Sequence, residues 1–260
     1  MSISSILKSP SYIISVNKPF HKYFKRNWPG HNVNVNLDKG WHHLVFLIDN
    51  SKYMKRLRGE LIISSIRKFV VNQHIKTVTC SIFTFDDKCT LIYDDYIFDI
   101  NNFIISKSCI DPRGTKSLTE ATAFAIEYTG RKLAALRESR PAKITFVTIS
   151  TSMEKTSHAF WSNNNGKDKL LRLVNEHKYI WGWSFYLLGT NINSIDDGEK
   201  IGYDKDKCIN FYNNNICLLY AMDICSKAVK KNCGFNNIER SKCNPNFKIA
   251  NGVSLVVRKK

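Results

Sequence analysis

Apolar residues along the chain follow two spacings, one typical of buried strands and one typical of amphipathic helices. Short apolar or alternating runs predict strands over 43–48, 77–85, 89–93, 144–149, 184–189 and 208–211. Apolar residues at helical spacing predict helices over 55–71, 117–137, 167–177 and 216–230, and a short helix from about residue 194. Strands that alternate with helices predict a doubly wound α/β fold, with helices on both faces of a mostly parallel sheet.

Residues 77–93 are the expected exception to parallel pairing. The short turn Asp86-Asp87-Lys88 separates their two strands, and so short a connection joins strands antiparallel. We therefore expect one antiparallel hairpin at an edge of the sheet. Further along, Ser117 and Glu120 have the spacing of a helix capping box, and Pro141 is expected to stop the helix that begins there.

The predicted elements lie within residues 41–230, which we interpret as one domain between two extensions, 1–40 and 231–260. The whole chain has 260 residues and a formal net charge of +17. Residues 1–40 carry six Lys/Arg against one acid, and residues 231–260 carry seven against one. The two ends thus contribute +5 and +6. Such a charge attracts anionic partners.

Aromatic and basic residues are interleaved over residues 20–28. Aromatic side chains are costly to leave in water, so we expect a partner to pack against Phe20, Tyr23, Phe24 and Trp28. The cations that could contact nucleic acid or another anionic partner are Lys22, Lys25, Arg26, Arg258, Lys259 and Lys260. For the last three, a solvated tail is the alternative.

Eight cysteines occur without Cys-x-x-Cys spacing, so we expect no zinc site. The N-terminus lacks the unbroken apolar segment of a secretion signal, and no run reaches the roughly 20 apolar residues of a membrane span. We expect a reducing, cytoplasmic compartment, in which most of the cysteines are small buried hydrophobic residues.

Oxygen-bearing side chains occur in three loops. Asp49 and Ser51 follow the first strand, Thr115 lies in a turn-rich segment, and Ser150-Thr151-Ser152 follows the strand at 144–149. In a doubly wound sheet, loops at the carboxyl ends of the strands converge to form the binding site. Carboxylate and hydroxyl oxygens suit a hard cation such as Mg²⁺.

The sequence of these loops resembles the von Willebrand factor A (vWA) family. Phe46-Leu47-Ile48-Asp49-x-Ser51 is similar to the start of its metal-ion-dependent adhesion site (MIDAS), Asp-x-Ser-x-Ser. Thr84-Phe85-Asp86-Asp87 resembles its Thr-Phe-Asp segment, and Arg113-Gly114-Thr115-x-x-Leu118-x-Glu120-Ala121 resembles its Gly-Thr-x-Leu-x-x-Ala threonine loop. Residues 183–192, followed by Ile209-Asn210-Phe211, resemble vWA-like proteins of phages and bacteria. The resemblance covers about residues 41–230 and implies the vWA fold.

Two positions depart from the MIDAS pattern. Tyr53 stands where the pattern has its second Ser, and Ile149-Ser150-Thr151-Ser152 stands where the family has Thr-Asp-Gly. Asp49 is then the one carboxylate, supported by Ser51 and Thr115. Either these three residues hold Mg²⁺ weakly, or they hydrogen-bond to loop backbone and keep the turn geometry. In both cases a partner could supply the missing carboxylate, as the resemblance to adhesive members of the family implies.

The sequence favours a binding protein over an enzyme. His42-His43 has no third partner at a useful spacing, and no nucleophile elbow or phosphate-binding loop occurs. We therefore expect a non-enzymatic vWA-type module for protein binding or assembly. The Lys/Asn/Ile-rich usage and the resemblance to phage proteins suggest a viral or virion-associated structural component. The alternative is a nucleic-acid-binding accessory protein that uses its basic termini.

Overall fold

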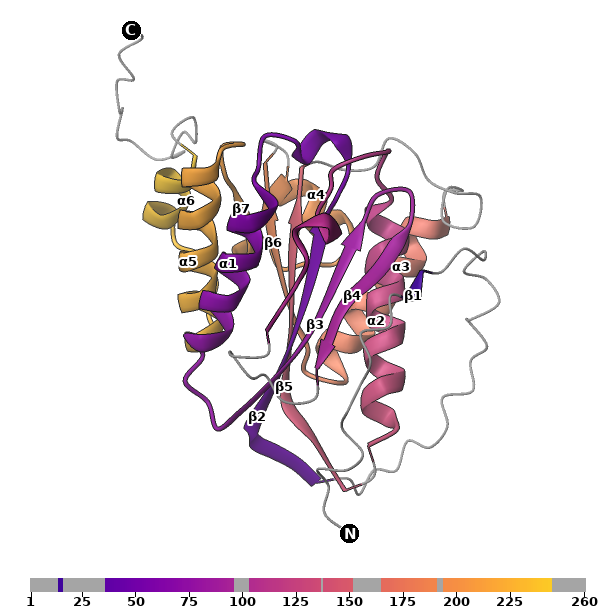
Figure 1. Cartoon of the computed structure of the whole chain (residues 1–260). Helices are drawn as coiled ribbons and strands as arrows, with labels where there is room; N and C mark the ends of the chain where they lie inside the picture. Colours follow the sequence, from indigo (N-terminus) through magenta and orange to yellow (C-terminus); the bar gives the residue numbers. More distant parts are fainter. Residues whose placement is uncertain are drawn as a thin grey trace, which may run out of the picture.

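The computed structural model describes residues 14–15, 36–95, 103–136, 138–151, 165–190 and 194–244. A twisted sheet lies at the centre of the fold (Figure 1). Its strands are β1 (Ile14–Ser15), β2 (Asn36–Asp49), β3 (Thr77–Phe85), β4 (Cys89–Asp95), β5 (Ser139–Ser150), β6 (Ser184–Gly189) and β7 (Cys208–Asn210). They lie in the order β1-β4-β3-β2-β5-β6-β7. The pairs from β3 across β2, β5 and β6 to β7 are all parallel, and β4 is antiparallel to β3. The predicted doubly wound fold with its hairpin is confirmed. The two-residue β1 pairs with β4, so β1 and not the hairpin forms that edge.

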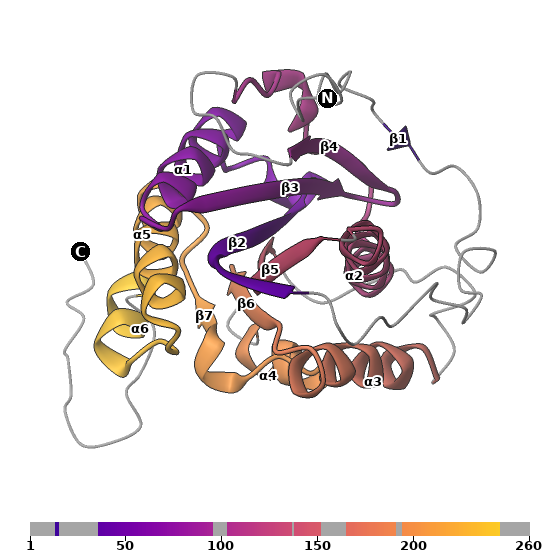
Figure 2. The ribbon, with the colours of Figure 1, turned by 90° about the horizontal axis from the view of Figure 1, so that it is seen from below.

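Helices cover both faces of the sheet (Figure 2). On one face lie α1 (Gly59–Val71), α5 (Asn215–Lys231) and α6 (Asn237–Cys243). On the other lie α2 (Leu118–Ala134), α3 (Asn165–Tyr179) and α4 (Ser194–Lys200). Short 3-10 turns occur at η3 (Lys52–Met54), η4 (Lys107–Cys109) and η5 (Lys205–Lys207). Among the described residues, none of these helices has the length and apolar character needed to cross a membrane.

The central strand β2 supplies both hydrophobic cores. Successive side chains of a strand point to opposite faces of its sheet. Leu44, Phe46 and Ile48 accordingly pack with α1 and α5, whereas Val45 and Leu47 pack with α2 and α3. All five side chains are fully buried. Because both faces of β2 are buried, residues 44–48 form a continuous apolar run in the sequence and do not alternate with polar residues.

Two local expectations around α2 were wrong. The helix ends at Ala134, and Pro141 lies inside β5, paired with Asp38 of β2 where the register shifts at a bulge. Proline is tolerated there because β6 pairs with β5 only from Thr145 onward. Ser117 is the N-cap residue, but its hydroxyl donates to Glu120 Oε2 (2.5 Å) and makes no bond to the helix backbone.

The described elements extend beyond residues 41–230. β2 begins at Asn36, and α6 forms within the segment 231–260, for which we predicted no helix. A capping box starts α6: the Asn236 side chain accepts from the Glu239 N–H, and the Glu239 carboxylate accepts from the Asn236 N–H, both at 2.9 Å. Cys243 at its end is buried, and its carbonyl accepts from the Tyr212 N–H.

Two neighbouring histidines of β2 are buried. His42 Nε2 lies 3.0 Å from Thr145 Oγ1, and His43 Nδ1 lies 2.8 Å from Thr79 Oγ1. Burial, together with the nearby Lys143 ammonium, lowers the pKa of His42 to about 3. Burial also lowers the pKa of His43 well below its ordinary value, with Lys132 adding to the effect. Both rings are therefore neutral in the folded protein at neutral pH.

These histidines should make the fold sensitive to acid. A folded-state pKa of His42 below the unfolded value of 6.5 means that the unfolded chain binds more protons, so stability falls as the pH drops from 6.5 toward 3. His42 alone should cost about 2 kcal/mol at pH 5. Urea unfolding at pH 7.5 and pH 5 should show this loss in the wild type and a smaller loss in His42→Gln. His74 is exposed, so His74→Asn should lose as much stability as the wild type. Equal losses in all three proteins would show that buried His42 is not the cause of the acid sensitivity.

Candidate binding site at the switch point of the sheet

The order of the strands places a binding position between β2 and β5. The chain leaves β2 toward β3 on one side and later builds β5, β6 and β7 on the other. Loops therefore diverge at the carboxyl ends of β2 and β5, which is where ligands bind in such sheets. Asp49 ends β2 and Ser150 ends β5, and the preceding residues Ile48 and Ile149 are paired.

The loop before α2 lies at the same carboxyl end of the sheet as the loops after β2 and β5. We call this end of the sheet the rim. The Arg113 N–H donates to the Asn50 carbonyl (2.8 Å), and the Lys52 N–H lies 3.4 Å from the Gly114 carbonyl. Gly114 has a φ of +63°, in the left-handed region that favours glycine. The sequence prediction that the loops of Asp49, Thr115 and Ser150 converge thus agrees with the structure.

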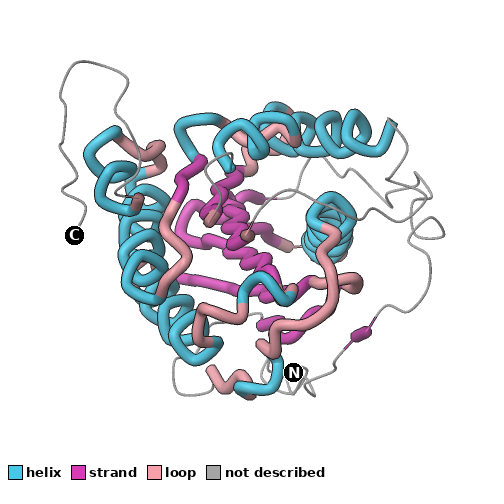
Figure 3. The backbone as a smooth tube through the Cα atoms, turned by 90° about the horizontal axis from the view of Figure 1, so that it is seen from above, coloured by secondary structure: helices cyan, strands magenta, loops and turns pink. Residues whose placement is uncertain are grey.

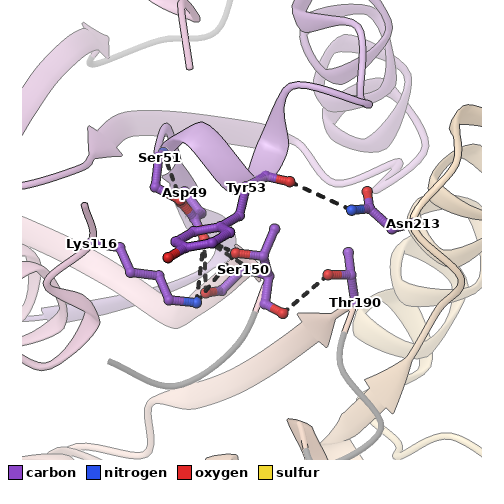
Figure 4. A network of polar contacts seen from close by, with 8 residues as sticks. Asp49, Ser51, Tyr53, Lys116, Ser150, Thr190 and Asn213 are labelled. Atoms are coloured by element: carbon purple, nitrogen blue, oxygen red, sulfur yellow. Dashed lines mark hydrogen bonds and ion pairs between the residues drawn. The ribbon is translucent and has the colours of Figure 1, made fainter. Parts of the chain in front are cut away.

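Asp49 is the centre of this rim (Figure 4). Its carboxylate is fully buried, and both oxygens accept hydrogen bonds. Oδ1 accepts from the Ser51 N–H at 2.8 Å. Oδ2 accepts from the Thr151 N–H (3.0 Å), the Thr151 hydroxyl (2.8 Å) and the Ser150 hydroxyl (3.2 Å). Asp49 therefore joins the loops after β2 and β5 through hydrogen bonds to the Ser51 and Thr151 N–H groups.

Lys116 is the residue of this site that sequence reasoning missed. Its ammonium lies 3.9 Å from Asp49 Oδ2 and donates to Thr151 Oγ1 at 3.2 Å. Its side chain is only 1% exposed. The local signal here is that two residues separate Thr115 from Leu118, whereas the threonine-loop pattern has one, and this spacing does not indicate where the Lys116 side chain points. The loop thus has an additional residue at this point.

Tyr53 lies next to the buried cluster that Asp49, Lys116, Ser150 and Thr151 form. The Lys116 ammonium lies 5.8 Å from the centroid of the Tyr53 ring, within the range of a cation–π contact (Figure 4). The Tyr53 carbonyl lies 3.5 Å from Asn213 Nδ2, which places the loop before α5 beside it. The Ser51 hydroxyl is buried with no hydrogen-bond partner among the described residues, and Thr115 is half-buried.

The residues at this rim do not fit a resident divalent cation. Mg²⁺ in proteins usually takes one or two carboxylates and keeps several waters. Here the one carboxylate already accepts four hydrogen bonds, and an ammonium lies beside it. A divalent cation placed about 4 Å from that ammonium would be repelled by about 8 kcal/mol at an effective dielectric constant of about 20. Among the described residues, no group of three His, Cys, Asp or Glu side chains could hold a metal ion.

A cavity of about 560 Å³ opens beside the cluster, between the β3–β4 hairpin and the loop before α2. Its lining includes Asn50, Asp86, Asp87, Lys88 and Arg113. Asp86 Oδ1 accepts from the Lys88 N–H (2.9 Å), so Asp86 closes the hairpin turn as its sequence predicts. Burial raises the pKa of Asp86, and a hydrogen bond with Asp87 adds to this, while Arg113 acts in the opposite direction.

The other predicted contact residues lie outside the described part of the chain. These are the aromatic set Phe20, Tyr23, Phe24 and Trp28, and the basic set Lys22, Lys25, Arg26, Arg258, Lys259 and Lys260. Their proposed contacts stay predictions from the sequence.

Solved structures of vWA proteins share this fold. Proximal thread matrix protein 1 from the mussel byssus is 11% identical with a TM-score of 0.53, and the match covers 74% of this chain and 46% of that one. A von Willebrand factor type A protein from Catenulispora acidiphila is 11% identical with a TM-score of 0.50, covering 73% and 42%. A further structure of the mussel protein, described as having a zinc-occupied MIDAS motif, is 13% identical with a TM-score of 0.51, covering 74% and 46%.

The chain therefore has a vWA-like fold, and it spans about half the length of these structures. No family model matches the sequence, and no curated protein is significantly similar to it. The likeness lies in the arrangement of strands and helices, with the MIDAS-like loops at the switch point.

Removing the buried charge should destabilise the fold. Asp49→Asn leaves the Lys116 ammonium buried without its counter-charge, which typically costs about 3 kcal/mol or more. Urea unfolding should show this as a lower midpoint with an unchanged slope. Asp111→Asn removes an exposed carboxylate from the neighbouring loop and should change stability by less than about 0.5 kcal/mol. Equal effects of the two substitutions would show that Asp49 does not hold the loops together.

Proposed function

We propose that this chain is a non-enzymatic, vWA-type module that binds an acidic protein surface at the loop rim above Asp49. The exposed part of the rim consists of the loop after β2, the loop before α2 and the loop before α5. Hydrogen bonds join the first of these loops to each of the other two. Figure 3 looks down onto the rim. Its fold and its exposed side chains support this proposal.

The exposed residues of the rim combine cations with aromatic and apolar groups. Residues 50–60 contain four Lys/Arg against one acid, Glu60. The exposed cations of the rim are Lys52, Lys55, Arg56, Arg58 and Arg113. Beside them lie Tyr53 (39% exposed), Tyr212 (49%) and Ile216 (79%). Arginine and tyrosine are enriched in protein interfaces, and this charge favours an acidic partner.

The buried cluster supports a binding role over a catalytic one. Catalysis by Asp49 or Lys116 would require a substrate to come within hydrogen-bonding reach of either group. The side chains of Asp49 and Lys116 are 0% and 1% exposed, and the Tyr53 ring lies 5.8 Å from the Lys116 ammonium. A partner would therefore meet the rim residues and not the cluster beneath them.

The observation that carries the proposal is the concentration of exposed cations around Tyr53 at the switch point. We propose a reducing compartment, because no disulfide joins the eight cysteines, all of which lie in the described residues, and five of them are buried. A role within a larger assembly, including a virion, is a further part of the proposal. It is based on the basic ends and the sequence resemblance to phage proteins.

Selection of peptides would test this docking surface. A displayed random peptide library is selected on the full chain, and the affinity of an enriched peptide is measured by fluorescence anisotropy. We expect acidic peptides, whose affinity falls at least tenfold in Tyr53→Ala and in Arg56→Glu, because both changes alter the centre of the rim. Tyr179→Ala removes a 78% exposed aromatic side chain at the end of α3 and should leave the affinity unchanged.

A short duplex DNA in the same assay tests the nucleic-acid alternative. Counterion release predicts that DNA affinity falls by several orders of magnitude between about 50 and 200 mM salt. Tight, salt-sensitive DNA binding without enriched acidic peptides would overturn the proposal. Enriched peptides that bind Tyr53→Ala and Arg56→Glu as tightly as the wild type would place the interface elsewhere.

A further inference from the structure

A positive charge is required beside Asp49. The carboxylate lies at the carboxyl end of β2 and has no exposed surface. Burying an ionised carboxylate is costly unless hydrogen bonds and an opposite charge compensate for it. Neutral donors from Ser51, Ser150 and Thr151 supply the hydrogen bonds, and the remaining need is for a cation.

The geometry shows which group meets that need. The Lys116 ammonium donates to the Thr151 hydroxyl, and the same hydroxyl donates to Asp49 Oδ2 at 2.8 Å. A continuous path therefore runs from ammonium to hydroxyl to carboxylate, alongside the direct approach of 3.9 Å. The Tyr53 ring lies over the ammonium and adds an attractive aromatic face.

We propose that the Lys116 ammonium acts as a tethered cation, in the place that a divalent metal ion would otherwise take beside Asp49. The side chain comes from the loop that also carries Thr115, the residue directly before it. The vWA-like loop cluster of this protein is thereby charge-balanced without a metal. Chelators should consequently leave both its stability and its binding unaffected.

The same cluster retains oxygen atoms that a metal could use once the lysine is removed. The Ser51 hydroxyl is buried and makes no hydrogen bond among the described residues. The hydroxyls of Ser150 and Thr151 already point at Asp49. Carboxylate and hydroxyl oxygens suit Mg²⁺ and Mn²⁺. Replacing Lys116 with a shorter, neutral residue should therefore turn the cluster around Asp49 into a divalent-cation site.

The test is a gain of metal binding by Lys116→Ser. Mn²⁺ is the probe, and its binding to the full chain is measured by electron paramagnetic resonance and by calorimetry. We expect Lys116→Ser to bind Mn²⁺ at least tenfold more tightly than the wild type. Adding Asp49→Asn to the same chain should abolish the gain, because it removes the carboxylate. The experiment contains no docking partner, so its outcome is independent of the proposed function.

A matched control comes from a second lysine–aspartate pair. The Lys132 ammonium contacts Asp94 Oδ1 (2.5 Å), and Asp94 also accepts from the hydroxyls of Ser81 and Tyr128. Lys132 is a similarly buried cation, with a side chain that is 6% exposed. Lys132→Ser should be destabilising like Lys116→Ser, but it should gain no Mn²⁺ binding, because Asp94 has one aliphatic hydroxyl partner, Ser81, and a weakly ligating phenol, whereas three aliphatic hydroxyls lie around Asp49.

Stability gives a second readout in case Lys116→Ser folds poorly. Mn²⁺ should raise the unfolding midpoint, or the refolding yield, of Lys116→Ser toward the wild-type value, and it should change neither the wild type nor Lys132→Ser. The proposal is overturned if the wild type binds Mn²⁺ as tightly as Lys116→Ser in an Asp49-dependent manner. It is equally overturned if Lys116→Ser neither binds Mn²⁺ nor is rescued by it.

Discussion

The buried carboxylate of Asp49 is the constraint on which the loop end of this protein depends. An ionised group with no exposed surface must find all its partners inside the protein, and Asp49 takes them from loops that are far apart in sequence. Thr151 comes from the end of β5, and Lys116 comes from the segment before α2. Hydrogen bonds to Asp49 hold the loops in place. The same hydrogen bonds compensate for the burial of its carboxylate.

The sheet explains why these partners are within reach. β2 lies between β3 and β5, and its side chains enter both cores, so the strand cannot move along its axis without disturbing both layers of helices. The register that pairs Ile48 with Ile149 also sets the relative positions of Asp49 and Ser150. A rigid scaffold thus presents loops whose outer side chains are free to differ from those of other proteins with this fold.

Charge has two separate roles at this rim. Beneath the surface, one ammonium balances one carboxylate, and their effect is on the conformation of the loops. Above them, Lys52, Lys55 and Arg56 are exposed near Tyr53 in the sequence, and Arg113 is paired with Asp86 (3.6 Å). The inner pair and the outer cations would respond differently to salt, because solvent screens exposed charges far more strongly than buried ones. Salt should therefore affect the proposed recognition of a partner more strongly than the stability of the loops.

The sequence alone determined the class of fold and the position of most elements. Thr77–Phe85 and Ser184–Gly189 were predicted with the bounds that the structure shows, because spacing and residue type are local properties. It also determined that Asp49 and Thr115 belong to loops of one rim, since the order of strands and helices implies a doubly wound sheet. The capping box of α6 was equally local, at Asn236 and Glu239, but it lay in a segment without apolar periodicity and was overlooked.

Only the tertiary structure decided what lies beside Asp49. Lys116 reads as an ordinary polar loop residue, and nothing local distinguishes a lysine that extends into solvent from one that extends inward. The direction of its side chain depends on Asp49 and Thr151, which are distant in sequence and meet it only after the sheet has formed. The same holds for Pro141, which a central strand accepts because the bulge opposite Asp38 and the late start of β6 pairing leave it room. Long-range contacts of this kind are created by folding, and a local sequence pattern does not contain them.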